Sequence, residues 1–131
     1  MKYSLDYFLQ KSWSFVLIKN GKIVFKSKAQ HLKPLIFCIK RHKKEMREAV
    51  VFDKIIGRAA AILLVYAGVK EVWTPTISRS GKAHLMKNEV KIGYKNLAEC
   101  IKNRKGDDLC PMEKISRKMT EKEFIKKILG K

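Results

Sequence analysis

Two apolar runs on either side of an Asn-Gly dipeptide form the first clear pattern in the chain. Residues 13–19 are rich in β-forming side chains, and residues 23–25 (Ile-Val-Phe) follow the dipeptide Asn20–Gly21. A tight hairpin turn needs positive φ at both central residues, which Asn and Gly adopt readily. The pattern therefore predicts two antiparallel strands joined at this dipeptide.

Apolar residues at helical spacing predict two helices after the hairpin. In residues 30–44 the apolar positions 32, 35, 36 and 39 share one face, and Pro34 suits the first turn. Residues 54–67 are apolar nearly all round, which is typical of a helix buried on most sides. Asp53 is a suitable N-cap and Gly68 a suitable C-cap for this second helix. Gly57 in its first turns costs roughly 1 kcal/mol relative to alanine, so we expect a backbone or a ligand to approach it closely.

Strands and helices alternate in the second half. The pattern predicts a strand over residues 69–78, with Pro75 at a sheet edge or a bulge, a helix over 80–88 and a strand over 91–95. Capping-box patterns beginning at Asn96 and Thr120 predict two more helices, the first reaching about residue 104, with a polar loop over 103–113. A hairpin followed by this alternation predicts one α/β domain over residues 1–131, with a mixed sheet and helices on both faces.

Composition narrows the class of protein further. No apolar stretch reaches the roughly 18 residues of a membrane-spanning helix, and the first residues lack a signal-peptide pattern, so we expect a cytoplasmic location and no membrane partner. The three cysteines are Cys38, Cys100 and Cys110. Their odd number and the lack of a C-x-x-C pair argue against a disulfide framework or a cysteine-rich metal site.

The chain is strongly basic, with a formal net charge of +18. Such a charge attracts polyanions and anionic ligands, although a lysine-rich proteome would produce it too. The densest run is residues 40–44 with Arg47. It falls at the end of a predicted helix, where cations complement the helix dipole, and this is the favoured explanation.

Four short motifs, in order, resemble a known family. Residues 53–61 read D-K-I-I-G-R-A-A-A, and residues 68–73 with 77–78 form the strand that follows. Asn103–Arg104 then precede a C-P-M-E segment at residues 110–113. Together these motifs resemble a prokaryotic family described as a domain of unknown function, whose fold is similar to that of cytidine deaminases. The resemblance spans roughly residues 14–115 and implies a three-layer α/β/α sandwich with a mixed sheet.

The zinc-ligand pattern of the deaminases is missing. Zinc deaminases use H-x-E and P-C-x-x-C motifs at the starts of two helices. The resemblance places these starts after Asp53 and after Ser78. None of the three histidines is followed two residues later by Glu, and residues 78–81 read S-R-S-G where cysteines would be needed. We therefore expect no zinc-dependent deamination, no bound metal and no other cofactor.

Two helix starts that meet in one crevice still offer an anion site without metal, because free N–H groups and helix dipoles favour negative charge. Ser78, Ser80 and Gly81 could cradle the anion, with Arg79 or Lys82 adding charge. The alternative is that Ser80 only caps its helix. Asn103 and Arg104 complete the predicted ligand-binding set.

The predicted catalytic residues are Asp53, Lys54, Cys110 and Glu113. Asp53 and Lys54 could place a carboxylate and an amine at the pocket; the alternative is a cap and a solvated lysine. A Cys110 thiolate near Arg104 could act as a nucleophile, with Glu113 as proton carrier. The alternative is a packed Cys-Pro turn with Glu113 in an ion pair.

The leading hypothesis is a metal-independent protein of deaminase-like fold that binds a nucleotide or another small anionic ligand. Whether it also acts on that ligand as an enzyme is left open. One alternative is a basic nucleic-acid-binding module that uses residues 40–47. The other is a non-catalytic regulatory or assembly domain that forms homo-oligomers.

Overall fold

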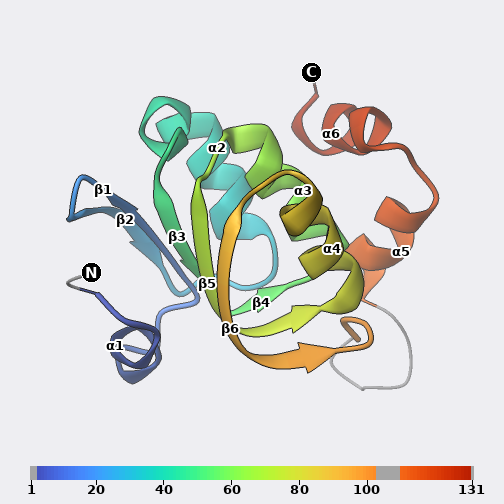
Figure 1. Cartoon of the computed structure of the whole chain (residues 1–131). Helices are drawn as coiled ribbons and strands as arrows, with labels where there is room; N and C mark the ends of the chain where they lie inside the picture. Colours follow the sequence, from blue (N-terminus) through green and yellow to red (C-terminus); the bar gives the residue numbers. More distant parts are fainter. Residues whose placement is uncertain (1–2, 103–109, 131) are drawn as a thin grey trace.

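The computed structural model describes residues 3–102 and 110–130, in which helices and strands alternate (Figure 1). The helices described are α1 (Leu5–Gln10), α2 (Lys33–Met46), α3 (Arg58–Ala67), α4 (Arg79–Lys87), α5 (Pro111–Arg117) and α6 (Glu121–Leu129). The strands described are β1 (Phe15–Lys19), β2 (Lys22–Ser27), β3 (Val50–Asp53), β4 (Ile55–Ile56), β5 (Glu71–Ser78) and β6 (Lys91–Ala98). None of these helices combines the length and the apolar character that crossing a bilayer requires.

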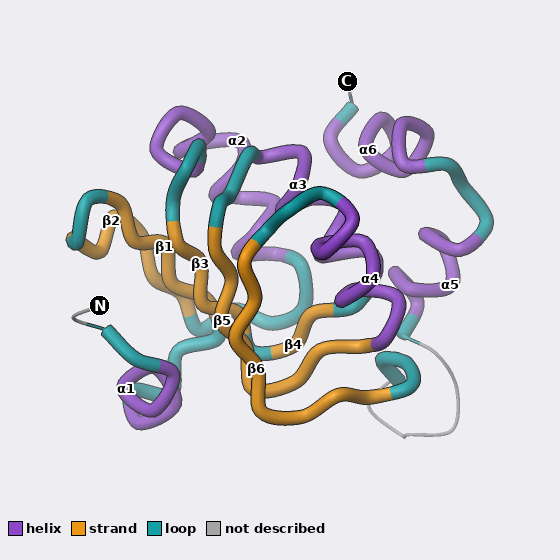
Figure 2. Tube along the Cα trace, viewed as in Figure 1, coloured by secondary structure: helices purple, strands orange, loops and turns teal. Residues whose placement is uncertain are grey.

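The described strands form one mixed sheet in the order β2-β1-β3-β5-β6, with β4 continuing the line of β3 (Figure 2). β1 runs antiparallel to β2 and β3, whereas β3, β4 and β6 all run parallel to β5. Phe52 lies opposite Trp73 and Ile55 lies opposite Thr76, so β3 and β4 keep one register along β5. The predicted mixed sheet is confirmed.

The interruption between β3 and β4 lies beside Pro75 in the central strand β5. At this point the backbone N–H of Lys54 donates to the carbonyl of Ser14, 3.0 Å away on the β1 side, and Lys54 has no pairing partner in β5. Proline has no backbone N–H to donate. A central strand therefore accommodates a proline where the pairing with its neighbouring strand is interrupted. The prediction of a sheet edge at Pro75 is wrong, because β5 has strands paired on both sides.

Helices cover both faces of the sheet (Figure 1). On one face α2, α3 and α4 form the larger core with the strands, and α6 adds Phe124 to it. On the other face α1 packs Leu5 and Phe8 against Val16 and Phe52 of the sheet. The result is a three-layer α/β/α arrangement, as the sequence resemblance implies.

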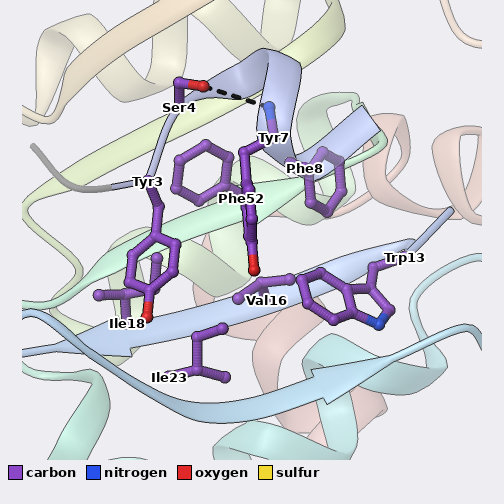
Figure 3. A pocket seen from close by; sticks show the side chains of 9 residues that line it. All are labelled: Tyr3, Ser4, Tyr7, Phe8, Trp13, Val16, Ile18, Ile23 and Phe52. Atoms are coloured by element: carbon purple, nitrogen blue, oxygen red, sulfur yellow. Dashed lines mark hydrogen bonds between the residues drawn. The ribbon is translucent and has the colours of Figure 1, made fainter. Parts of the chain in front are cut away.

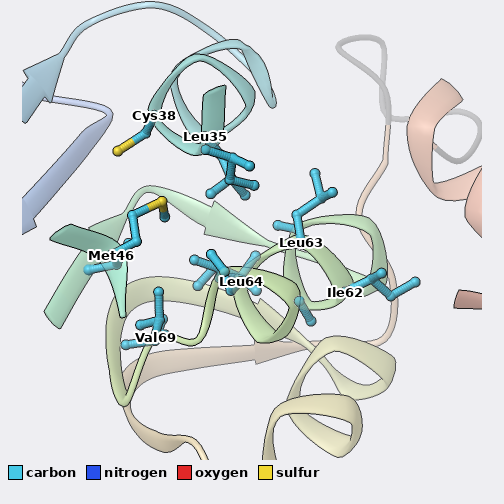
Figure 4. Packing of buried hydrophobic residues seen from close by; sticks show 14 of the residues in the cluster. Leu35, Cys38, Met46, Ile62, Leu63, Leu64 and Val69 are labelled. Carbon is cyan, nitrogen blue, oxygen red and sulfur yellow. The ribbon is translucent and has the colours of Figure 1, made fainter. Parts of the chain in front are cut away.

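Helix α3 stands at the centre of the larger core. Residues 59–64 are all buried, and Figure 4 shows Leu63 and Leu64 among side chains such as Leu35 of α2 and Val69. A helix with apolar side chains on every side can be stable only where neighbours surround it. The prediction of a helix buried on most sides is confirmed.

The predicted turns and caps are confirmed at four places. Asn20 and Gly21 both have positive φ, 52° and 77°, in the hairpin turn. Pro34 lies in the first turn of α2, and Gly68 caps the end of α3 with a φ of 81°. The capping box at Thr120 is formed by both of its hydrogen bonds.

The predicted N-cap at Asp53 is wrong. Asp53 is the last residue of β3, and α3 begins only at Arg58, with Gly57 as its N-cap. In the segment between them, Ile55 and Ile56 form β4. Both are β-branched, and pairing with β5 offers them a ladder that the first turn of a helix would not.

The predicted helix beginning at Asn96 is also wrong. Strand β6 continues to Ala98, which lies opposite Ser78 at the end of β5. The full length of β5 is available for pairing, and this tertiary contact overrides a local capping pattern. Helix α4 begins at Arg79, one residue earlier than predicted, and α1 had no prediction.

Candidate functional site

The carboxylate of Glu113 completes the start of helix α3. Glu113 lies in the first turn of α5 and is buried. It accepts hydrogen bonds from the backbone N–H groups of Arg58, at 3.1 Å, and Ala59, at 2.9 Å. The first N–H groups of a helix lack partners and carry partial positive charge, so a carboxylate is stabilised there. Glu113 therefore occupies the anion position that α3 offers.

Glycine is required at position 57 because of this carboxylate. A Cβ added to Gly57 would lie 2.5 Å from the carboxylate carbon of Glu113. A Cβ added to Gly81, in α4, would lie 2.9 Å from the carbonyl of Gly57. The starts of α3 and α4 thus touch through two glycines. The close approach expected at Gly57 comes from a side chain on one side and a second helix on the other.

The residues predicted to cradle an anion lie together at the start of α4. Ser78 is fully buried and is the N-cap. Its Oγ accepts from the backbone N–H of Gly81 at 3.0 Å and lies 3.3 Å from the Oγ of Ser80. Ser78, not Ser80, therefore caps this helix. The polar groups at the helix start make their contacts with one another.

The two cations expected near this helix start have other partners. Arg79 forms an ion pair with Glu99 at 2.6 Å, and Lys82 donates to the hydroxyl of Tyr94 at 2.9 Å. Arg79 and Glu99 are well exposed, at 63% and 79% of their side-chain surface, so their pair contributes little to stability.

A pocket lies at the end of β3, on the other side of β4. It has a volume of about 310 Å³, and we call it the Asp53 pocket. Its described lining residues are Ser12, Ser14, Lys28, Ala29, Gln30, His31, Asp53, Lys54 and Ile55. It therefore contains the Asp53–Lys54 pair that the sequence singled out, together with side chains from the segments before β1 and after β2.

The Asp53 pocket combines three kinds of surface. Lys28 and Lys54 are exposed, so their ammonium groups are free to reach a ligand from solvent, and the imidazole of His31 is exposed beside them. Ile55 is 48% exposed and supplies an apolar wall. Asp53 is buried, and this burial raises its pKa well above the usual value. Burial therefore favours the protonated carboxyl, which both donates and accepts a hydrogen bond.

Two residues of the Asp53 pocket have a left-handed backbone without being glycine. Ser12 has a φ of 59° and His31 a φ of 61°. This conformation is disfavoured for residues with a Cβ, and it persists only where the surrounding structure imposes it. Asn20, Glu48 and Glu89, which do not line this pocket, have the same backbone, so the conformation describes the loops around the pocket and does not by itself mark a ligand site.

The remaining predicted residues lie at the start of α5 or beyond the described part. Cys110 is the N-cap residue of α5 and is half-buried, and its backbone N–H donates to the carbonyl of Ile101 at 2.9 Å. Asn103 and Arg104 lie outside the described residues. A contact between Arg104 and Cys110 therefore stays a prediction.

The predicted site residues thus fall into two groups separated by β4. Asp53 and Lys54 line the pocket, whereas Glu113 joins the helix starts at Gly57, beside Gly81. Sequence reasoning missed the other lining residues of the pocket. The left-handed backbone of two of them arises from loop packing and has no signature in side-chain pattern.

A second hollow lies under α1 and is entirely apolar in character. Figure 3 shows Tyr7, Trp13 and Phe52 around it. Its volume of about 10 Å³ leaves room for a single water molecule at most. It is a packing gap between α1 and the sheet and not a ligand site.

No metal centre is evident in the part of the chain that the structure describes. Within residues 3–102 and 110–130, no three His, Cys, Asp or Glu side chains gather closely enough to hold an ion. Between the starts of α3 and α4, the Glu113 carboxylate and the close approach of Gly57 and Gly81 fill the space.

The mixed sheet with helices on both faces defines the class as α/β proteins, and the fold is similar to that of a deaminase. The structure is similar to a diaminohydroxyphosphoribosylaminopyrimidine deaminase/5-amino-6-(5-phosphoribosylamino)uracil reductase from Thermotoga maritima, with a TM-score of 0.51 and 13% identity. The match covers 88% of this chain and 34% of that one. At this identity the likeness concerns the fold alone.

Within this class, the chain belongs to the family described as Domain of unknown function (DUF1893), whose model matches residues 5–131. The structure is also similar to the crystal structure of a DUF1893 family protein from Thermotoga maritima, with a TM-score of 0.87 and 26% identity. That match covers 96% of this chain and 85% of the other. No curated protein sequence matches the chain. The family resemblance noted from the four motifs is thereby confirmed at the level of the family.

Proposed function

We propose that the protein binds a nucleotide or a similar small anionic ligand in the Asp53 pocket. The observation that carries the proposal is the conjunction of a buried carboxyl, whose pKa burial raises, with exposed cations and an apolar wall in one hollow. Its volume of about 310 Å³ is at the lower end of the range for small-molecule sites. Nucleotides carry the matching groups: an anion, a flat apolar ring and a polar ring edge.

The phosphate would lie against Lys28 and Lys54. Both lysines are exposed at the pocket, so they can contact a phosphate without a large desolvation cost. The exposed imidazole of His31 adds a hydrogen-bonding group to the same pocket. We place the anion here and not at the helix starts, because the N–H groups of α3 already bind Glu113.

The ring would pack on Ile55 with its edge toward Asp53. A protonated carboxyl offers a donor and an acceptor side by side, which matches the amide-like edge of a nucleobase. Ile55 exposes 48% of its surface, so its side chain is accessible to a ring that enters the pocket. Under this proposal Glu113, Ser78 and Gly81 are structural, and Cys110 takes no part in binding.

Calorimetric titration with the common nucleoside monophosphates and with inorganic phosphate tests the proposal. We expect at least one nucleotide to bind, and Lys54→Ala to weaken it about tenfold or more, since a hydrogen bond to a charged group contributes about 1.5–3 kcal/mol. At about 100 times Kd the ligand should stabilise the protein by about 2.7 kcal/mol, visible as a raised Tm.

Lys70→Ala is the matched control, because Lys70 is an exposed lysine just before β5, at the opposite end of the sheet from the pocket. It should leave affinity unchanged. If no nucleotide binds, or if Lys54→Ala and Lys70→Ala behave alike, the proposal is wrong.

A further inference from the structure

Phe37 on α2 presents an aromatic ring to solvent. It is 46% exposed, and its ring stacks on Phe25 of β2 with centroids 5.3 Å apart and planes 25° apart. The Arg41 guanidinium lies 5.6 Å from the Phe37 ring centroid, within cation–π range. A single exposed aromatic needs no explanation on its own, but this one is backed by a second ring and joined by a cation.

A hollow of about 350 Å³ opens beside these rings. Its lining includes Phe25, Phe37, Lys26 and Lys33. We call these four residues together with Arg41 the Phe37 platform. Lys33 lines this hollow and Arg41 lies over the Phe37 ring, whereas the Lys26 ammonium lies over the ring of Trp13, 4.8 Å from its centroid. An aromatic face flanked by Lys33 and Arg41 matches the two parts of a nucleotide unit, a base that stacks and a phosphate that needs positive charge.

The platform lies next to the Asp53 pocket. Ala29 lines both hollows, so they meet at the segment between β2 and α2. A ligand with several nucleotide units could therefore occupy both at once. The net charge of +18 is far more than a mononucleotide needs, and it complements a polymer with one negative charge per unit.

We propose that the Phe37 platform binds single-stranded nucleic acid, with one base stacked on Phe37 and the flanking phosphates on Lys33 and Arg41. A single strand is required, because a duplex hides the faces of its bases within its own stack. Only the placement of a neighbouring nucleotide in the Asp53 pocket rests on the proposed function. The platform itself depends on the rings, the cations and the charge.

The test is fluorescence anisotropy with labelled single strands of about 12 nucleotides, a length within the known site sizes of single-strand binders. Oligothymidylate and oligouridylate form the two arms, and the tighter one identifies DNA or RNA as the partner. Phe37→Ala should weaken binding about tenfold, whereas Phe37→Tyr, which keeps a stacking ring, should retain it. Lys33→Ala should lower the salt slope by about 0.7.

Lys126→Ala in α6 is the charge-matched control, because this exposed lysine belongs to an element far from β2 in the fold (Figure 1). The inference is overturned if Phe37→Ala weakens binding no more than Lys126→Ala does. It is also overturned if a duplex of the same length competes equally well, or if neither strand binds at about 50 mM salt.

Mononucleotide titrations on the same variants separate the two proposals. If Phe37→Ala leaves both strand and mononucleotide binding intact, the platform is wrong while the Asp53 pocket stands. If Lys54→Ala leaves mononucleotide binding intact while Phe37→Ala abolishes strand binding, the pocket is wrong while the platform stands.

Discussion

Asp53 carries a buried carboxyl group at the edge of the proposed binding pocket. It ends β3, where the ladder to β5 is interrupted, and its carboxyl is buried at the edge of a pocket. A carboxyl in that position is costly when ionised, because water no longer solvates the charge. Its presence at a buried position is more easily understood as a binding group than as a contribution to stability.

The raised pKa of Asp53 makes stability depend on pH. A group whose pKa is higher in the folded state contributes fully below the unfolded value, near 3.8, and its contribution is lost as pH rises toward the folded value. Asp53→Asn, which cannot ionise, should therefore gain stability relative to the natural protein as pH rises, by about 1.4 kcal/mol for each unit of pKa shift. Urea unfolding at about pH 5 and about pH 8 measures the difference.

Asp6→Asn is the control for this comparison, because it removes an exposed carboxylate that pairs with Lys95 at the surface. Equal pH dependence in the two variants would contradict the assignment of a buried carboxyl with a raised pKa to Asp53.

Single residues were predictable from sequence where local rules decide them. The Asn20–Gly21 turn and the Thr120 capping box depend on neighbours in the chain, and both were correct. Asp53 was singled out from the sequence, but its predicted role as a helix cap was wrong. The helix starts later because Ile55 pairs with Thr76 of β5, 21 residues further along the chain, and local sequence rules do not include such a contact.

At the scale of elements, α3 depends on α5 to complete its first turn. Glu113 supplies the hydrogen-bond acceptors, and Gly57 leaves the room for them. Buried carboxylates on helix N–H groups form charge-assisted hydrogen bonds, which are about twice as strong as neutral ones. The C-terminal helices are thereby fastened to the centre of the core.

Gly57→Ala should destabilise the protein by about 2–3 kcal/mol, because its methyl group would overlap the Glu113 carboxylate. In the Glu113→Ala background the same change should cost much less, since the obstructing group is gone. A double-mutant cycle from urea unfolding gives the coupling between the two positions. Additive effects would show that the close approach at Gly57 has no energetic consequence.

Elements with strong periodicity were predictable, and elements set by pairing were not. The apolar run of α3 and the hairpin were recognised from pattern, whereas β4 and the last residues of β6 were taken for helix. In both cases β5 offered free pairing positions to the neighbouring segment, and pairing outweighed the local signal.

At the scale of the whole molecule, the fold class was predictable because alternating elements permit few arrangements. The pocket was not, because its lining comes from segments around β1, β2 and β3 that only the folded chain brings together. Charge is the other property of the whole molecule. A net charge of +18 acts on every part of the surface and opposes the compact state through self-repulsion.

Salt should therefore stabilise the protein. Raising sodium chloride from about 20 mM to about 300 mM shortens the Debye length several-fold and should raise Tm by a few degrees, measured by calorimetry. A variant with Lys40→Glu and Lys44→Glu, two exposed positions on α2, should respond less to salt. A Tm that does not change with salt would show that the positive charges are locally compensated.

The bond between Glu113 and the start of α3 has a consequence for synthesis on the ribosome. The two partners are separated by 55 residues, so at about 5–20 residues per second the glutamate is made roughly 3 to 11 seconds after the backbone that it completes. During that interval the most apolar helix of the protein has an unfinished first turn. The nascent chain thus exposes its most aggregation-prone helix before the hydrogen bonds of that helix are complete. This is the state in which chaperones would bind it.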